Sequence, residues 1–249
     1  MLGRVLSRNP HDVDVTAAAA ADLPALDAAV TDCYACARLV AWREQIAVER
    51  RAAFRDQQYW GRPVPGFGPV DAAIGILGLA PAAHGGNRTG RVFTGDRSGD
   101  VLFAALHRAG LANQPTSVSA SDGLTLRHTR IFAAVRCAPP DNKPTPAERD
   151  TCAPWLHREI ALLAPGLTVV VALGAFAWAA WWPAMTAVYG RPAPVPRPKF
   201  GHGAQVSVPG TPTLLGSFHV SQQNTFTGRL TPVMLDDVFA RAKAVAGLA

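Results

Sequence analysis

The four cysteines of this chain constrain its fold more than any other feature. Two residues separate Cys33 from Cys36, and Cys137 and Cys152 follow after a gap of 100 residues. Two thiolates in this close spacing can face one metal centre, and the second pair completes the set that an iron–sulfur cluster or a structural zinc requires. Two disulfides or separate buried thiols are the alternatives. We expect no secretory leader, so a metal or cluster site is favoured, with iron and zinc both open.

Composition and charge favour a globular protein with an anionic partner. The 249 residues are 49% hydrophobic and carry 24 basic against 18 acidic side chains, a net charge of +6. A positive excess of this kind is typical of proteins that bind nucleic acid. The longest apolar run, residues 169–182, is too short to span a membrane. We therefore expect no membrane partner and a cytoplasmic, nucleoid-associated location in a reducing compartment.

After an Ala-rich start, the chain alternates between strand-like and helix-like segments. We expect residues 1–24 to form a loosely ordered arm and residues 25–249 to form one domain. A helix is expected over residues 26–59, with Cys33 and Cys36 near its start. Short apolar runs predict buried strands at residues 72–79, 129–136, 167–173 and 212–216. Helices are expected at residues 100–109, 146–164, 175–183 and 232–246. This alternation implies an α/β fold with helices on both faces of a parallel sheet.

Three loops at the carboxyl ends of these strands are richer in polar residues than a connection needs. Ligands of open parallel sheets bind at this edge. The first loop contains GLAP at residues 78–81 and NRTGRVFTGD at residues 87–96. The second reads VRCAPPDNKPTP at residues 135–146, and the last reads SFHVSQQNTFTGRLT at residues 217–231. A GxGxxG pattern is absent, so a dinucleotide cofactor is not supported.

These motifs and the four cysteines resemble the uracil-DNA glycosylase superfamily, and most closely its type-5, iron–sulfur branch. The resemblance runs from about Cys33 to the last predicted helix. It implies a three-layer α/β/α sandwich with a central four-stranded parallel sheet. It also implies a [4Fe–4S] cluster as cofactor, and the four cysteines as its ligands. The cluster would be structural, because base hydrolysis transfers no electrons.

The resemblance implies a DNA repair enzyme that flips a damaged base out of the helix and hydrolyses its N-glycosidic bond, leaving an abasic site. The expected bases are uracil, hypoxanthine and 5-hydroxymethyluracil, in double- or single-stranded DNA. No lysine stands beside His219 in the matched motif, so a lyase step through a Schiff base is not supported. The alternative is a non-catalytic module of the same fold that binds damaged DNA. We expect a monomer, with a replication clamp as a candidate partner.

Two side chains carry the expected chemistry. Phe93 resembles the ring on which the flipped base stacks. His219 resembles the histidine that donates to the uracil oxygen and stabilises the leaving anion. Many superfamily members place an Asp or Asn at the position of Ala80, where it orients the attacking water. The methyl side chain of Ala80 cannot orient a water molecule. We therefore expect another residue of the same loop to do so, with Asn87 as the first candidate and Asp96 as the second. Asp96 is equally suited to capping the following helix.

Further residues are expected at the DNA. Gly78 and its loop could bring backbone amides to the ligand, and Asn142 is a candidate for reading the base edge. The loop after His219 is expected to enter the minor groove, with Gln222 and Gln223 filling the gap and Phe226 as an apolar wedge. The expected phosphate contacts are Arg88, Arg91, Lys143 and Arg229, each with the alternative of a solvated surface charge. Trp178, Trp181 and Trp182 are expected in the core.

Overall fold

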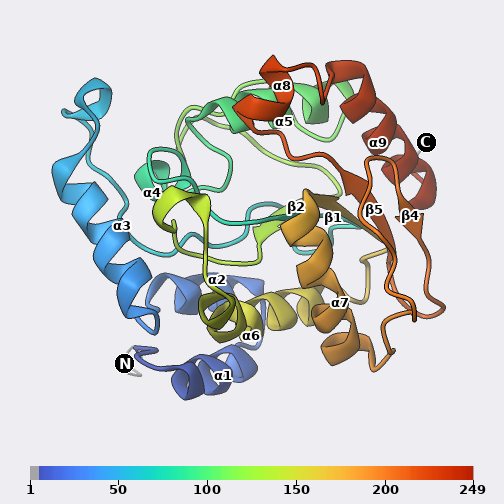
Figure 1. The fold of residues 1–249 in the computed structure, drawn as a ribbon, viewed down its shortest axis with the longest axis horizontal. Helices are drawn as coiled ribbons and strands as arrows, with labels where there is room; N and C mark the ends of the chain where they lie inside the picture. Colours follow the sequence, from blue (N-terminus) through green and yellow to red (C-terminus); the bar gives the residue numbers. More distant parts are fainter. Residues whose placement is uncertain (1–5, 249) are drawn as a thin grey trace.

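The computed structural model describes residues 6–248, which form a central sheet between two layers of helices (Figure 1). The strands are β1 (Ile74–Gly78), β2 (Thr129–Ala133), β3 (Val169–Leu173), β4 (Gln205–Val206) and β5 (Thr213–Ser217). Their order is β2-β1-β3-β5-β4. The four expected strands are all present and all parallel. The sheet has a fifth strand that was not expected, because the chain before β5 folds back and pairs β4 antiparallel to it at the edge.

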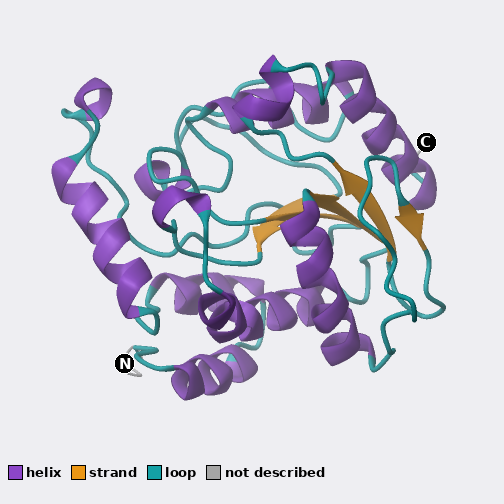
Figure 2. Cartoon of the chain, viewed as in Figure 1, coloured by secondary structure: helices purple, strands orange, loops and turns teal. Residues whose placement is uncertain are grey.

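Helices cover both faces of the sheet, which confirms the expected three layers (Figure 2). One face is covered by α6 (Pro146–Leu163) and α7 (Ala175–Tyr189), and the other by α5 (Arg97–Arg108) and α9 (Pro232–Val245). Successive residues of β3 point to opposite faces, so Val170 joins the first core and Val171 the second. Within residues 6–248, no helix combines the length and the apolarity that crossing a bilayer requires.

The expectation of a loosely ordered arm over residues 1–24 is wrong for most of its length. Residues 1–5 lie outside the described residues, but α1 (Pro10–Ala19) and the start of α2 (Leu23–Thr31) are helical. The Asn9 side chain caps α1 by accepting from the Asp12 amide, 2.9 Å away. Val13 and Ala17, one turn apart, are buried in the core shared with α6. A face of only two apolar residues gives almost no periodic signal in an Ala-rich sequence.

Two helix boundaries also differ from expectation. The helix expected over residues 26–59 is broken at the cysteines: α2 ends at Thr31, and α3 (Ala37–Glu49) begins after Cys36, its N-cap residue. A short 3-10 turn, η1 (Ala52–Phe54), follows α3. The aromatic helix does not stop at Pro183, because α7 continues to Tyr189. Burial of this helix, including the three tryptophans as expected, outweighs the interior proline, which costs about 3 kcal/mol.

A buried ionic network joins α6 to β2 and to the residues that precede Cys137. The Glu159 carboxylate is fully buried on α6 and accepts from Arg130 Nε at 2.6 Å and from Arg136 Nη2. Arg130 also binds Asp27 of α2 at 2.7 Å. Burial alone would raise the pKa of Glu159, but the charges of Arg136 and Arg130 outweigh it and lower the pKa. The carboxylate therefore stays ionised and holds β2, through Arg130, and the segment after β2, through Arg136, against α6. Asp27 adds the contact of Arg130 with α2.

Replacing Glu159 by Gln should destabilise the fold strongly, because two buried guanidinium groups would lose their counter-charge. We expect the free energy of unfolding to fall by about 3 kcal/mol or more, measured by urea denaturation at pH 7. Asp236→Asn is the matched control, because Asp236 pairs with Arg108 at the surface, where the two side chains are 38% and 44% exposed. The control should lose less than about 1 kcal/mol. Equal losses in the two variants would contradict the role of the network.

Candidate active site

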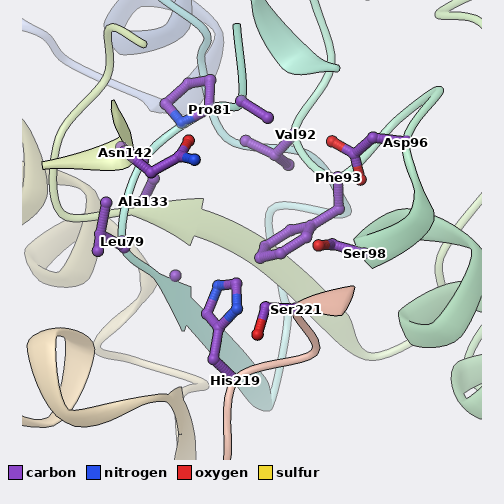
Figure 3. Close-up of a pocket in the computed structure, with 13 residues that line it drawn as sticks. Leu79, Pro81, Val92, Phe93, Asp96, Ser98, Ala133, Asn142, His219 and Ser221 are labelled. Carbon is purple, nitrogen blue, oxygen red and sulfur yellow. The ribbon is translucent and has the colours of Figure 1, made fainter. Parts of the chain in front are cut away.

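A pocket of about 250 Å³ opens at the carboxyl ends of β1, β2 and β5 (Figure 3). Strand register places these ends together: Gly78 is level with Ala133, and Leu173 is level with Ser217. All three motif loops contribute to the lining. The lining residues are Gly78, Leu79, Ala80, Pro81, Ala82, Val92, Phe93, Asp96, Ser98, Ala133, Asn142, His219 and Ser221. The lining is mostly apolar, with a few polar groups that converge on one space.

Phe93 presents its ring to the pocket from a strained backbone conformation. Its φ is +50°, in the left-handed region that bulky residues avoid. The ring lies against Gly78, where a side chain would place its Cβ only 3.0 Å from Phe93 Cε2. Gly78 is therefore the residue that leaves room for the ring. Figure 3 shows Phe93 and His219 facing the same space, with ring centroids 6.2 Å apart and planes tilted by 39°.

The backbone of His219 is fixed while its imidazole is free. Asn224 Nδ2 donates to the His219 carbonyl at 2.8 Å, and Gly174 lies so close that a side chain there would come within 3.2 Å of His219 Cβ. Among the described residues, none hydrogen-bonds to the His219 ring. Burial lowers the pKa of His219, so the ring is neutral at pH 7. A neutral imidazole carries one N–H donor, and here that donor is available to a ligand.

Asp96 is the one carboxylate among the residues that line the pocket. Its Oδ1 accepts from the Gly99 amide at 2.9 Å and so caps α5, as expected for a residue before a helix. Burial raises the pKa of Asp96. Because the side chain also lines the pocket, capping and a role at the ligand are compatible. Ala80 lines the same pocket, and its methyl side chain offers no polar atom.

Asn87, the first substitute expected from the sequence, does not line the pocket. Its side chain is fully buried and points to α3, where Nδ2 donates to the Arg43 carbonyl at 3.1 Å. It lies on the short helix α4 (Gly86–Thr89), whose turn directs Asn87 away from the ligand space. The expectation that Asn87 positions water is therefore corrected in favour of a structural contact between α4 and α3.

The pocket contains polar side chains that sequence reasoning placed and others that it missed. Asn142 lies at the pocket in the left-handed conformation, with φ +56°, at the end of the turn η2 (Pro140–Asn142). Ser98 and Ser221 were missed. Ser98 lies in the first turn of α5, and Ser221 is the N-cap of α8 (Gln222–Phe226). Serines in these places look like ordinary helix starts, so no sequence signal separated them.

Arg88 and Arg91 are not exposed phosphate ligands. Arg88 is 7% exposed and donates to the His84 carbonyl at 2.8 Å and the Gly95 carbonyl at 2.6 Å. Its guanidinium also lies over the Phe54 ring, 4.0 Å from the centroid. Arg88 thereby links the pocket loop to the η1 turn, which corrects its expected role to a positioning one.

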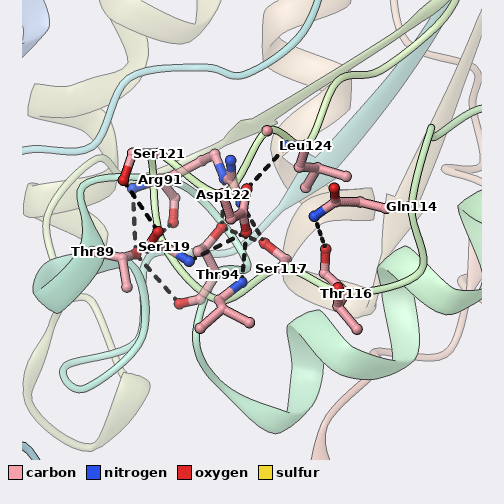
Figure 4. Close-up of polar contacts among 12 residues, drawn as sticks. Thr89, Arg91, Thr94, Gln114, Thr116, Ser117, Ser119, Ser121, Asp122 and Leu124 are labelled. Carbon is pink, nitrogen blue, oxygen red and sulfur yellow. Dashed lines mark hydrogen bonds and ion pairs between the residues drawn. The ribbon is translucent and has the colours of Figure 1, made fainter.

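Arg91 belongs to a polar network that fixes the loop bearing Phe93 (Figure 4). Its Nε donates to Thr94 Oγ1 and its Nη2 to Ser117 Oγ, each at 2.9 Å, and Asp122 pairs with Nη2 at 2.8 Å. Asp122 also accepts from the backbone amides of Val118, Ser119 and Leu124. The network joins residues 89–94 to residues 117–124, so the expectation of a phosphate contact at Arg91 is also wrong.

Two exposed arginines line a second cleft of about 430 Å³ beside the pocket. Arg51 and Arg97 are exposed and line it, together with His84 and Gln57. Asp96 lines both the cleft and the pocket, and Gln222 of α8 also lines the cleft. The arginine and aspartate residues of the cleft are Arg51, Arg88, Arg97, Asp96 and Asp100. Asp100 lies 3.8 Å from Arg97. Arg51 is therefore the exposed cation of this cleft for which the described residues show no carboxylate partner.

The loop after His219 is exposed where the sequence predicts contact with DNA. Gln222 and Gln223 are exposed, and Phe226 is 73% exposed on α8. Arg229 is exposed and lies over the Phe218 ring, 4.6 Å from its centroid. Lys143 is also exposed. These side chains are free to reach a ligand, unlike Arg88 and Arg91.

The four cysteines line one small cavity between α3, α6 and the end of β2. No disulfide joins any two of them. Burial and the neighbouring sulfur atoms raise the pKa of Cys36 to about 12, and burial raises that of Cys137 to about 11. Within residues 6–248, no three His, Cys, Asp or Glu side chains are disposed to hold one metal ion. Arg43 lies in the same cavity, fully buried, and two of its nitrogen atoms have no hydrogen-bond partner in the part of the chain that the structure describes.

The Arg91–Asp122 pair should make stability depend on acid pH. Burial would raise the pKa of Asp122, but hydrogen bonds from Arg91 and the backbone lower it to about 2. The stabilisation is therefore complete above the ordinary pKa of 3.8 and disappears as the pH falls through about 2. We expect Asp122→Asn to cost about 1–2 kcal/mol of unfolding free energy at pH 6 and progressively less below pH 4. Asp150→Asn, at an exposed pair with Arg149, is the control; a pH-independent loss in Asp122→Asn would contradict the assignment.

Comparison with known proteins agrees with this arrangement. A sequence model of the uracil DNA glycosylase superfamily matches residues 65–243. A type-5 uracil-DNA glycosylase of Mycobacterium bovis is 57% identical over 90% of this chain and 81% of its own length. Type-5 enzymes of Mycobacterium leprae and Thermus thermophilus are 54% and 52% identical, over 92% and 88% of this chain and 98% and 96% of their own lengths. The three motif loops belong to one continuous match that includes the strands carrying them. The chain is therefore a member of the uracil DNA glycosylase superfamily.

Proposed function

We propose that this protein is a DNA repair glycosylase that hydrolyses the bond between uracil and deoxyribose and leaves an abasic site. The observation that carries the proposal is the pairing of Phe93 and His219 across a pocket at the strand ends. The names of the relatives, type-5 uracil-DNA glycosylases, support the same substrate. A base inside a duplex cannot reach such a pocket, so the nucleotide must first leave the base stack.

Phe93 and His219 would act on the departing base. A base lying on the Phe93 ring gains stacking energy of about 1–3 kcal/mol. As the glycosidic bond breaks, negative charge develops on the base, and the His219 N–H is placed to donate to its oxygen. Because burial lowers the pKa of His219, the neutral form of the ring is favoured at pH 7, and this form still keeps one N–H to donate. A fixed donor in a site closed to water stabilises such charge far better than water does.

Asp96 is the group best placed to hold the attacking water. Its carboxylate lines the pocket, whereas the Ala80 side chain has no polar atom and Asn87 points to α3. Asp96 Oδ1 is held by the Gly99 amide, which fixes the orientation of the side chain. A carboxylate can both orient a water molecule and stabilise the positive charge that develops on the sugar. Its presence in the pocket weighs against the alternative of a non-catalytic module that only binds damaged DNA.

We infer a substrate range wider than uracil. Ala80 and Ala133 line the pocket with methyl groups, and Asn142, which is mostly exposed, is the one amide side chain in the lining. A site with few fixed polar partners discriminates weakly between bases, because a mismatched base leaves few groups unpaired. Hypoxanthine and 5-hydroxymethyluracil are therefore proposed as further substrates.

The DNA backbone would follow the cleft beside the pocket. Arg51 and Arg97 are exposed there, Gln222 of α8 lines the cleft, and Phe226 on the same helix is 73% exposed. This arrangement supports α8 as the element that enters the minor groove at the vacated position. Duplex and single-stranded DNA both present the phosphates and the base that this surface would bind.

We also propose a [4Fe–4S] cluster held by the four cysteines. The four cysteines line one cavity, and Arg43 is buried in it with two nitrogen atoms that have no hydrogen-bond partner among the described residues, which fits a negatively charged group in that cavity. When bound, the cluster would supply a structural cross-link and no step of the hydrolysis. The chain itself supplies the two ends of that link: residues 33–36 before α3, and Cys137 and Cys152 beside β2 and in α6. Such a cluster persists in a reducing compartment, which is the proposed location.

Replacing His219 by Ala should slow cleavage without abolishing DNA binding. We expect the single-turnover rate on a duplex with one uracil to fall by about 100- to 1,000-fold, measured as strand breaks after alkali treatment. The Kd for the same duplex should change less than about threefold. His107→Ala, at an exposed position of α5, is the control and should cleave normally. An unchanged rate in His219→Ala would remove this residue from the mechanism, and no cleavage by the native protein would refute the proposed function.

The water-positioning assignment predicts opposite results at two residues of one loop. Asp96→Asn keeps an N-cap that is as good as the original but removes the negative charge, so the rate should fall by at least about tenfold. Asn87→Ala should leave the rate within about threefold and lower stability, because it loses the contact with Arg43. Rates from single-turnover assays and unfolding free energies from urea denaturation test both. The reverse pattern would assign the positioning of the attacking water to Asn87 and not to Asp96.

A further inference from the structure

Arg43 is a buried cation without a matching carboxylate. It is 0% exposed on α3, and its Nη1 donates to Cys137 Sγ and to the Cys33 carbonyl, each at 3.0 Å. Nε and Nη2 are buried with no hydrogen-bond partner among the described residues. The nearest carboxylate is that of Glu44, 3.8 Å from Nη2, and its side chain is 51% exposed to solvent.

Three other buried arginines, Arg91, Arg130 and Arg136, pair with carboxylates at short range. Arg88 is buried without such a pair, but each of its three nitrogen atoms donates a hydrogen bond, whereas two nitrogen atoms of Arg43 have no partner among the described residues. Arg91 has Asp122 at 2.8 Å, and Arg130 has Glu159 at 2.6 Å. Transferring a guanidinium from water to the interior costs several kcal/mol unless a negative group and hydrogen bonds replace the water. Arg43 has one thiol, one carbonyl and the face of the Tyr34 ring, 4.8 Å away. These neutral groups leave its positive charge unbalanced, so the cavity itself must supply a negative partner.

We propose that Arg43 is the counter-charge of a metal–tetrathiolate centre in this cavity. The inference rests on the cofactor given under the proposed function. An oxidised [4Fe–4S] core with four thiolates carries two net negative charges and would compensate the buried guanidinium. A zinc ion with four thiolates carries the same charge, but the sulfur atoms would have to move closer together, because no three of the described His, Cys, Asp or Glu side chains are disposed to hold a single ion. Arg43 is a positioning residue: it touches a ligand sulfur and not the substrate.

Arg43 also connects this centre to the active-site loop. Its backbone carbonyl accepts from Asn87 Nδ2 at 3.1 Å, while its side chain donates to Cys137. The Asn87 carbonyl in turn accepts from the Gly61 amide at 3.0 Å, so α4 is held from two sides. The side chain of Arg43 thus contacts a proposed ligand of the cofactor, and its backbone contacts the loop that leads to Phe93.

The test compares holoprotein variants by a property of the centre and not by activity alone. Arg43→Gln removes the charge, Arg43→Lys keeps it, and Arg50→Gln at the exposed end of the same helix is the matched control. The readouts are the iron and zinc contents, the rate at which a chelator removes the metal, and, for an iron centre, the reduction midpoint potential. We expect Arg43→Gln to lose metal about tenfold faster or more and to have a lower midpoint potential. Arg43→Lys and Arg50→Gln should stay within about threefold of the native rate.

Each outcome decides the inference. A native rate and potential in Arg43→Gln would overturn it, and so would a preparation of the native protein with neither iron nor zinc. If the native protein contains zinc and Arg43→Gln loses it faster, the role of Arg43 as counter-charge would be supported and the iron–sulfur cofactor refuted. If Arg43→Gln does not fold, Arg43→Lys tests the proposal instead. Because lysine keeps the positive charge, we expect a near-native midpoint potential for an iron centre, or a near-native rate of metal removal for zinc; a changed value would overturn the proposal. Uracil excision by the native protein, assayed separately, shows whether the proposed function stands.

Discussion

The parallel alignment of four strands is the constraint on which the site depends. Because β1, β2 and β5 run in the same direction and end level with one another, three loops far apart in the sequence meet at one edge. Phe93 reaches that edge from the loop after β1, and His219 from the loop after β5. The pocket needs no further element to bring these rings together. Its remaining requirement is that the long first loop hold one conformation.

Buried charge supplies that rigidity at several points around the sheet. Arg91 and Asp122 fix the loop that bears Phe93, and Glu159 fixes the end of β2. Each of these charges is compensated within the protein, so each holds its partners in one geometry. Arg43 departs from this pattern, because two of its buried nitrogen atoms have no partner among the described residues; under our proposal its counter-charge would come from the cofactor. The cofactor would thus complete a set of ionic anchors that otherwise lies within the polypeptide.

The sequence predicted the four parallel strands because buried runs such as residues 169–173 are apolar throughout, and it predicted the site through long motifs. It could not distinguish inward from outward arginines: Arg88 and Arg91 stand in the same motif as Phe93, yet both are buried. Arginine looks alike in sequence whether it meets a phosphate or a carboxylate that folds in from elsewhere. Asn87 misled for the same reason, since its partner is a backbone carbonyl on α3. The helix α1 was missed because two apolar residues suffice to dock an alanine-rich helix.

The proposed mechanism requires an everted base in the space between Phe93 and His219. The most direct measurement is a crystal structure of the protein with a duplex that contains a 2′-fluoro-deoxyuridine, which resists hydrolysis. We expect the uracil ring against Phe93, a base oxygen within hydrogen-bond distance of the His219 ring, and the adjoining phosphates in the cleft at Arg51 and Arg97. A uracil still stacked in the duplex, or a base bound elsewhere with the pocket empty, would contradict this mechanism.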